Sequence, residues 1–207
     1  MIITDDIVGE KYNKLIRYAI DHSDAVMVVW SDCPTSNKVK TVADWRRELL
    51  ELSPLIHITP EIVKRWEKKE RSEKEALDFI RYKRKPFLES MSPFMIKMRH
   101  NTEWPSTIVI SSKNTYNIAL YRICKEIYPF LLEPGGYYLW RYPKFPEDLS
   151  FFKDNRCWLY ASSHEEYLEF LPRSRDEYDF ISSLDIHLDA PYKPIDDEER
   201  YWEDYDL

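Results

Sequence analysis

The chain has 207 residues, of which 43% are hydrophobic and 15% aromatic, and its formal net charge is −7. This length and apolar content indicate a folded protein with a core of its own and exclude a disordered chain. No apolar run approaches the roughly 18 to 20 residues of a membrane span, and the N-terminal sequence lacks the pattern of a signal peptide. Cys33, Cys124 and Cys157 form no CxxC motif, so we expect reduced thiols and a cytoplasmic location.

Glycine is scarce, since only Gly9, Gly135 and Gly136 are present. Walker loops and dinucleotide-binding loops need several glycines where the backbone approaches a phosphate. Neither motif is found, so these nucleotide-binding classes are excluded and no cofactor is expected.

The charge is unevenly distributed along the chain. From Asp185 to the C-terminus nine acidic residues stand against two basic ones, which accounts for the whole net charge of −7. The segment 61–99 carries twelve Lys and Arg against seven acidic residues, a local charge of +5. These are either two solvated surfaces, or the acidic tail 185–207 contacts the basic segment or a basic partner.

Helix and strand patterns alternate in the first part of the chain. Apolar residues at helical spacing predict a helix over 10–22, and the β-branched run 25–30 predicts a buried strand. After a polar loop over 31–40, the spacing of Val42, Trp45, Leu49 and Leu52 predicts a second helix over 42–52.

The charged segment begins with a helix-start signal. Thr59 is a predicted N-cap, followed by Pro60 at the first helical position and by an acidic residue in the first turn. The helix continues into the charged stretch. The pattern over 72–85 either extends it or forms a second short helix, which ends before Pro86.

The second half of the chain mixes strands and helices. The segment 106–112 predicts a strand, and 117–132 has the most extensive helical pattern, kinked or ended at Pro129. The Pro-Gly-Gly sequence at 134–136 is a stop signal, and 137–140 predicts a third strand.

A hairpin and a last helix complete the predicted elements. The segments 149–152 and 156–161 form a predicted hairpin across 153–155. A helix follows over 173–182, and the tail beyond Asp189 is expected to be extended or loosely docked.

These elements predict an α/β fold with an α+β tendency: a mixed sheet of about five strands, helices packed on it, and a C-terminal antiparallel hairpin. We expect one domain over 1–184, a charged helical insertion over 61–100, and a separate acidic tail over 185–207.

Three segments carry a resemblance to a known family: RYAIDHSDAVMVV at 17–29, EWP at 103–105, and FPEDLSFFKDNRCWLYASSHEE at 145–166. On these segments the sequence resembles a small family of proteins from bacilli that often carry the label "stage III sporulation protein AH". The resemblance covers about two thirds of the chain and leaves out 61–100 and the acidic tail. It implies a soluble α/β domain, and it transfers no activity and no catalytic residue.

The polar residues of the block 145–166 have two interpretations. Asp148 can accept hydrogen bonds from backbone amides, and Ser162 or Ser163 can cap a short helix, which are structural roles. Alternatively, the hairpin brings Asp148, His164 and Glu165 to one edge of the sheet, as a general base or as metal ligands. Their spacing matches no established ligand motif, and the structural interpretation accounts for nearly every polar residue. We expect no metal site, and we expect Cys157 to be a buried residue and not a nucleophile.

The function expected from these features is non-enzymatic protein binding, of the inhibitor or immunity type. The partner is another protein, of basic character, recognised through the acidic tail and through aromatic side chains. The expected contact residues are Trp158, Tyr160, Trp202, Glu203 and Asp204.

Two alternatives remain beside this hypothesis. One is a small hydrolase or metal-dependent enzyme that uses Asp148, His164 and Glu165. The other is a structural role, including a homodimer formed through the aromatic hairpin. No membrane is expected as a partner, because no apolar run is long enough to span one. No nucleic acid is expected either, because acidic residues interrupt the basic segment throughout and the sequence pI is about 5.4.

Overall fold

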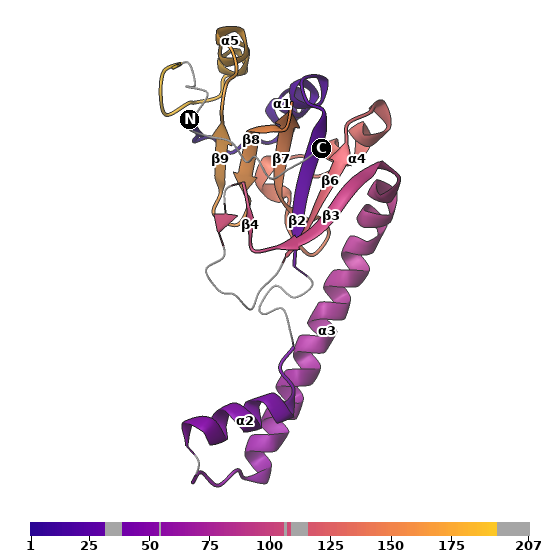
Figure 1. Ribbon diagram of the computed structural model, residues 1–207, viewed down its shortest axis with the longest axis vertical. Helices are drawn as coiled ribbons and strands as arrows, with labels where there is room; N and C mark the ends of the chain where they lie inside the picture. The colour runs from indigo at the N-terminus through magenta and orange to yellow at the C-terminus, as the bar shows by residue number, and fades with distance from the viewer. Residues whose placement is uncertain (32–38, 54, 106, 109–115, 194–207) are drawn as a thin grey trace.

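The body of the protein is a seven-stranded sheet with helices on it. The computed structural model describes residues 1–31, 39–53, 55–105, 107–108 and 116–193. The strand order is β1-β9-β8-β7-β2-β6-β3, and every neighbouring pair is antiparallel (Figure 1). The strands are β1 (Ile2–Ile3), β2 (Ala25–Trp30), β3 (Met95–Asn101), β6 (Tyr116–Arg122), β7 (Glu147–Lys153), β8 (Arg156–Ser162) and β9 (Tyr167–Phe170). The combination of helices with a sheet is confirmed, but the sheet is antiparallel instead of mixed and has more strands than expected.

The helices of the described part differ greatly in length. They are α1 (Gly9–Asp21), α2 (Val42–Leu52), α3 (Pro60–Met91), α4 (Tyr128–Leu132) and α5 (Arg175–Ser183), with 3₁₀ turns at Ser92–Phe94, Lys125–Ile127 and Tyr137–Leu139. The short strands β4 (Glu103–Trp104) and β5 (Thr107–Ile108) pair separately. None of the helices in the described ranges is both long and apolar enough to cross a membrane.

The interior strand β2 packs against apolar clusters on both faces of the sheet. All six of its residues are buried, and they alternate between two apolar clusters. Val26, Val28 and Trp30 belong to the larger cluster, which also contains side chains of α1, α3, α4 and α5. Residues of odd number in β2 belong to the smaller cluster on the other face, together with Trp104 of β4. This burial on both faces is why the sequence of β2 is a continuous apolar run.

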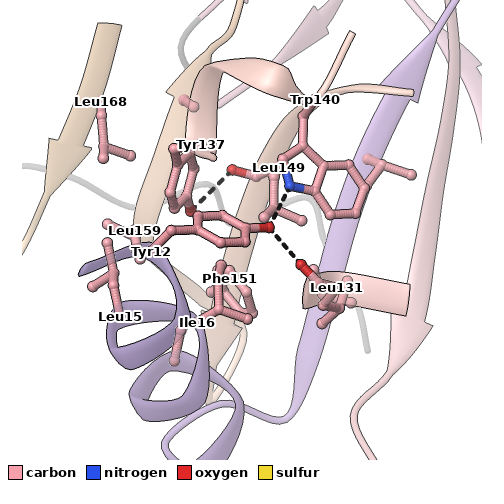
Figure 2. Packing of buried hydrophobic residues seen from close by; sticks show 14 of the residues in the cluster. Tyr12, Leu15, Ile16, Leu131, Tyr137, Trp140, Leu149, Phe151, Leu159 and Leu168 are labelled. Atoms are coloured by element: carbon pink, nitrogen blue, oxygen red, sulfur yellow. Dashed lines mark hydrogen bonds between the residues drawn. The ribbon is translucent and has the colours of Figure 1, made fainter. Parts of the chain in front are cut away.

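A hydrogen-bonded pair of aromatic residues lies in the larger cluster. The indole Nε1 of Trp140 donates to the hydroxyl of Tyr12, 2.9 Å away, and that hydroxyl donates to the carbonyl of Leu131 (Figure 2). Nearby, the hydroxyl of Tyr137 donates to the carbonyl of Leu149 over 3.4 Å. These groups are buried, and their bonds tie α1, α4 and the segment after the 3₁₀ turn to one another.

The helix α3 is a single rod of 32 residues, which at 1.5 Å per residue is about 48 Å long. Its N-cap is Thr59, as predicted, whose hydroxyl accepts from the Ile62 N–H at 3.4 Å. Its C-terminal turns reach the core through Phe87 and Met91, both buried. The N-terminal half extends away from the sheet and carries α2, and we call α2 with this half of α3 the arm (Figure 1).

The prediction that the helix ends before Pro86 is wrong. Pro86 lies inside α3, where it removes one backbone hydrogen bond. The helix continues because Phe87 packs edge-on against Trp140 and Phe145, with ring centroids 5.6 Å apart in each pair. The charged segment is therefore helical to Met91, and its last residues form the edge strand β3.

The predicted helix over 117–132 is also wrong. Residues 116–122 form β6, which pairs with β2 on one side and β3 on the other, and only Tyr128–Leu132 is α-helical. The residues of β6 are buried on both faces, so apolar side chains occur at almost every position and imitate a broad helical face. Pro129 lies in the first turn of α4, where proline is tolerated.

Most of the remaining predictions are confirmed, one is wrong, and one lies partly outside the described residues. The helices over 10–22, 42–52 and 173–182, the strand 25–30 and the hairpin of β7 and β8 are confirmed within one or two residues. The strand predicted over 137–140 is wrong, because Tyr137–Leu139 is a 3₁₀ turn whose tyrosines pack into the helical layer. Of the strand predicted over 106–112, β5 covers Thr107–Ile108, and 106 and 109–112 lie outside the described residues.

We predict that Tyr12→Phe lowers the free energy of unfolding by about 1–3 kcal/mol, because it leaves the Trp140 N–H and the Leu131 carbonyl buried without their partner. Urea denaturation followed by tryptophan fluorescence measures the change. The matched control is Tyr82→Phe, which removes a hydroxyl from a residue that is 72% exposed and should change stability by less than about 0.5 kcal/mol. Equal losses in the two variants would show that the buried network is not the cause.

Candidate binding site

Asp148 is a structural residue at a bulge in the sheet. Between Met27 and Val29 the pairing of β2 with β7 gains an extra residue on β7, and Asp148 there has a φ of 55°. One carboxylate oxygen accepts the backbone N–H of Ser163 at 2.7 Å, and the other accepts the indole N–H of Trp104 at 2.8 Å. Both oxygens are therefore used inside the fold, and burial raises the pKa of this carboxyl.

His164 and Glu165 lie in the turn between β8 and β9, on the surface. Their side chains are exposed, and His164 Nε2 lies 3.7 Å from Glu165 Oε1. The short helix expected after Ser162 is not formed. The chain instead turns back, with the Glu165 N–H donating to the Ser162 carbonyl at 3.2 Å, and continues as β9.

The three candidate residues thus have different surroundings. Asp148 is buried with both oxygens bonded, whereas His164 and Glu165 face solvent. Within the described ranges no group of three His, Cys, Asp or Glu side chains could hold a metal ion. This arrangement offers no shared pocket for a general base and its substrate.

Two of the expected partner contacts are core residues. Trp158 is buried and its indole N–H donates to the Ser23 hydroxyl at 2.8 Å, while the Tyr160 hydroxyl donates to Glu169 at 2.6 Å. Both residues are buried because they belong to β8, which lies in the interior of the sheet. The prediction that they are surface contacts is therefore wrong. Trp202, Glu203 and Asp204 lie outside the described residues. Cys157 is buried, as predicted, and burial raises the pKa of its thiol.

Glu147, the neighbour of Asp148, is a second acidic residue whose pKa is raised. It borders a cavity of about 50 Å³ together with Arg84, Tyr116 and Tyr142. Burial, reinforced by the Asp148 carboxylate, raises the pKa of Glu147 to about 7. A carboxyl with this pKa can exchange protons near neutral pH, but a cavity of this volume holds only one or two water molecules. It offers no room for a substrate.

The larger concavity lies on the arm, between α2 and α3. It has a volume of about 630 Å³, which is within the usual range of ligand sites. Trp45 of α2 and Trp66 of α3 line it together with Ile62, and the polar lining residues are Arg65, Lys68, Lys69 and Ser72. We call this concavity the arm groove.

Local interactions hold the two walls of the arm groove together. Thr41 forms a capping box with Asp44 at the start of α2, and the Val42 N–H donates to Glu70 of α3 at 2.9 Å. Lys69 lies over the ring of Trp45, with its Nζ 5.1 Å from the centroid. The groove therefore depends on contacts between two helices that both stand clear of the sheet.

Sequence reasoning identifies the helices of the arm groove but not the groove. The sequence predicts helices that begin where α2 and α3 begin, and it shows the basic excess of the segment 61–99. The missing information is that α2 folds back on α3. A usable signal is Trp45 and Trp66, since a tryptophan on each of two consecutive, otherwise polar helices favours their packing together.

Comparison with protein-family models, with curated proteins and with solved structures finds no match. The resemblance to the sporulation-labelled family therefore stays a prediction. The case for a function rests on the geometry of the chain.

We predict that Asp148→Ala lowers the free energy of unfolding by about 2–4 kcal/mol, because two buried donors lose their acceptor. Asp148→Asn should cost less, about 1–2 kcal/mol, since asparagine tolerates a positive φ and keeps one oxygen. The control is Asp154→Ala, at an exposed turn position with a φ of 50°. Like Asp148→Ala, it places an alanine at a positive φ, but it does not deprive buried donors of their acceptor. Denaturant titration should then give a smaller loss for Asp154→Ala than for Asp148→Ala.

The raised pKa of Glu147 predicts a pH-dependent loss of stability. The folded state keeps this proton up to about pH 7, whereas the unfolded chain releases it near 4.5. Stability from this group is therefore present below about pH 4.5 and is lost as the pH rises to about 7, by roughly 2–3 kcal/mol. Glu147→Gln should remove this loss and be more stable than the parent protein at pH 8.

Denaturant midpoints measured from pH 5 to 8 test this prediction, with the exposed Glu165→Gln as the control for loss of one charge. The difference in stability between Glu147→Gln and the parent should grow with pH. A difference that stays constant over this range would contradict it.

Proposed function

We propose that the chain is a protein-binding protein of the inhibitor type that engages its partner through the arm. The observation that carries the proposal is the arm groove, a concavity of about 630 Å³ with two tryptophans, on a helical pair held away from the sheet. Tryptophan and arginine are the residues most enriched among strong contacts in protein interfaces. We also place the protein in the cytoplasm, which is supported by the free thiols of Cys124 and Cys157.

Exposed apolar side chains elsewhere on the arm support the same conclusion. Leu52 is 84% exposed, Leu55 is 100% exposed and Ile56 is 38% exposed. They cluster at the connection between α2 and α3, at the far end of the arm (Figure 1). Apolar residues gathered at one exposed end are typical of a surface that another protein covers.

The enzymatic alternative has weaker support. Asp148 is committed to two internal hydrogen bonds, and the cavity at Glu147 is too small for a substrate. The homodimer through the aromatic hairpin also loses support, because Phe151, Phe152 and Trp158 of that hairpin are buried. The basic partner expected for the acidic tail 185–207 remains a proposal. In this tail Ile186 is buried in the core and Asp185 pairs with Lys11, and residues 194–207 lie outside the described part.

Site-specific photocrosslinking tests the proposal. A benzoylphenylalanine at position 55, which is fully exposed, should give a light-dependent adduct with one protein in the cells that naturally express the chain. The same amino acid at position 180, on α5, should give none. After identification by mass spectrometry, the purified partner should bind the double variant Leu52→Ser, Leu55→Ser at least tenfold more weakly than the parent, since burying one leucine contributes about 1.5–3 kcal/mol.

The proposal fails if adducts form equally well from positions 55 and 180, or if the double serine variant binds the partner with unchanged affinity. Circular dichroism of the variant is the check on folding. Both leucines are largely exposed, so the helical signal should equal that of the parent.

A further inference from the structure

The geometry points to an acidic protein segment as the occupant of the arm groove, namely a short run of Asp and Glu that carries one aromatic or large aliphatic side chain. This inference rests on the proposed protein-binding function and names the chemistry of the partner. The site proposed here is the arm groove, and it is separate from the acidic tail 185–207, for which a basic partner was proposed above.

The apolar part of the arm groove accounts for the apolar anchor. Trp45 and Trp66 are half-buried, and Ile62 lies with them in the lining. Indole rings that remain partly open to solvent gain most from an aromatic or aliphatic group that packs against them. The volume of about 630 Å³ has room for such a side chain together with the backbone on either side.

The polar part of the arm groove accounts for the negative charge. Arg65, Lys68 and Lys69 line it, and none of the described lining residues is acidic. None of these three cations takes part in an ion pair with any residue in the described ranges, although Lys74 and Arg47, also on the arm, are paired. Three cations beside an apolar surface, one of which (Lys69) lies over the Trp45 ring, complement a ligand that is both anionic and apolar.

A protein segment fits these features better than a nucleic acid does. A nucleic-acid strand needs a continuous basic track along its phosphates. Here Glu67, Glu70 and Glu73 alternate with the cations along the same helix, so the basic residues of α3 form no continuous positive track. A localised patch of three cations around two indoles suits a few carboxylates flanking one anchor residue.

The arm groove is also preformed. The bond from Val42 to Glu70 and the contact of Lys69 with the Trp45 ring join α2 to α3 without any ligand, and the capping box of Thr41 and Asp44 fixes the first turn of α2. The conformational entropy lost on binding is therefore mainly that of the peptide, which favours measurable affinity for a short segment.

The test is fluorescence anisotropy with the full chain and a fluorescein-labelled peptide of twelve residues, in which Asp and Glu alternate around one central Trp. We expect saturable binding that weakens as salt rises from about 50 to 500 mM. Replacing the central Trp by Ala, or all acids by Asn and Gln, should each weaken binding at least tenfold. The variant Lys68→Glu, Lys69→Glu should do the same, as should Trp66→Ala.

The matched control is Lys64→Glu, Arg71→Glu. Both residues are exposed on α3 and absent from the lining, and the change in net charge is identical. This variant should bind the peptide within about twofold of the parent, and the helical signal of every variant is checked by circular dichroism. Because Lys68 and Lys69 are exposed, their reversal tests the groove even if Trp66→Ala loses its helical signal.

Three results would overturn the inference: no peptide binding, equal losses in the two charge-reversal variants, or tighter binding of a single-stranded twelve-nucleotide DNA or RNA than of the peptide. Any of these can occur while position 55 still crosslinks to a protein partner. In that case the arm remains a binding surface and only the acidic chemistry of the partner is wrong.

Discussion

Trp140 is the contact on which the arrangement of helices around the sheet depends. Its indole N–H is bonded to the Tyr12 hydroxyl of α1, and its ring packs edge-on against Phe87 of α3. One buried side chain therefore fixes two helices that are far apart in the sequence. The cost of burying its N–H is offset because the Tyr12 hydroxyl accepts this hydrogen bond and in turn donates one to the Leu131 carbonyl. The position of α3, and with it that of the arm, depends on this packing.

The two carboxylates at the start of β7 show how burial divides neighbouring residues into different roles. Asp148 accepts two N–H bonds and joins β7 to the β8–β9 turn and to β4. Glu147 has a pKa of about 7, because it is partly buried beside that carboxylate. The polar residues of the block 145–166 thus mainly stabilise the sheet. The surface that resembles a binding site lies on the arm, in a segment with no recognisable motif.

The sequence predicts local structure well where a single signal decides it. Thr59 caps its helix, the Lys153–Asn155 turn forms its hairpin, and the β-branched run of β2 is a strand. It fails where tertiary contacts override local patterns: β6 is a strand because β2 and β3 flank it, and α3 passes through Pro86 because Phe87 is anchored in the core. The candidate site could not be predicted, since the arm groove exists only through the packing of α2 on α3, and the residues that form it are ordinary charged-helix residues apart from two tryptophans.

The length of α3 has a mechanical consequence. From Phe87 to Trp66 the helix rises about 32 Å, and over this distance a rotation of only about 10° at the core end displaces the groove by about 5 Å. A small rotation of α3 about the aromatic contact of Phe87 in the core is therefore enlarged at the distant groove. The position of the groove relative to the sheet therefore depends on the packing of Phe87 against Trp140 and Phe145, about 32 Å away along the helix.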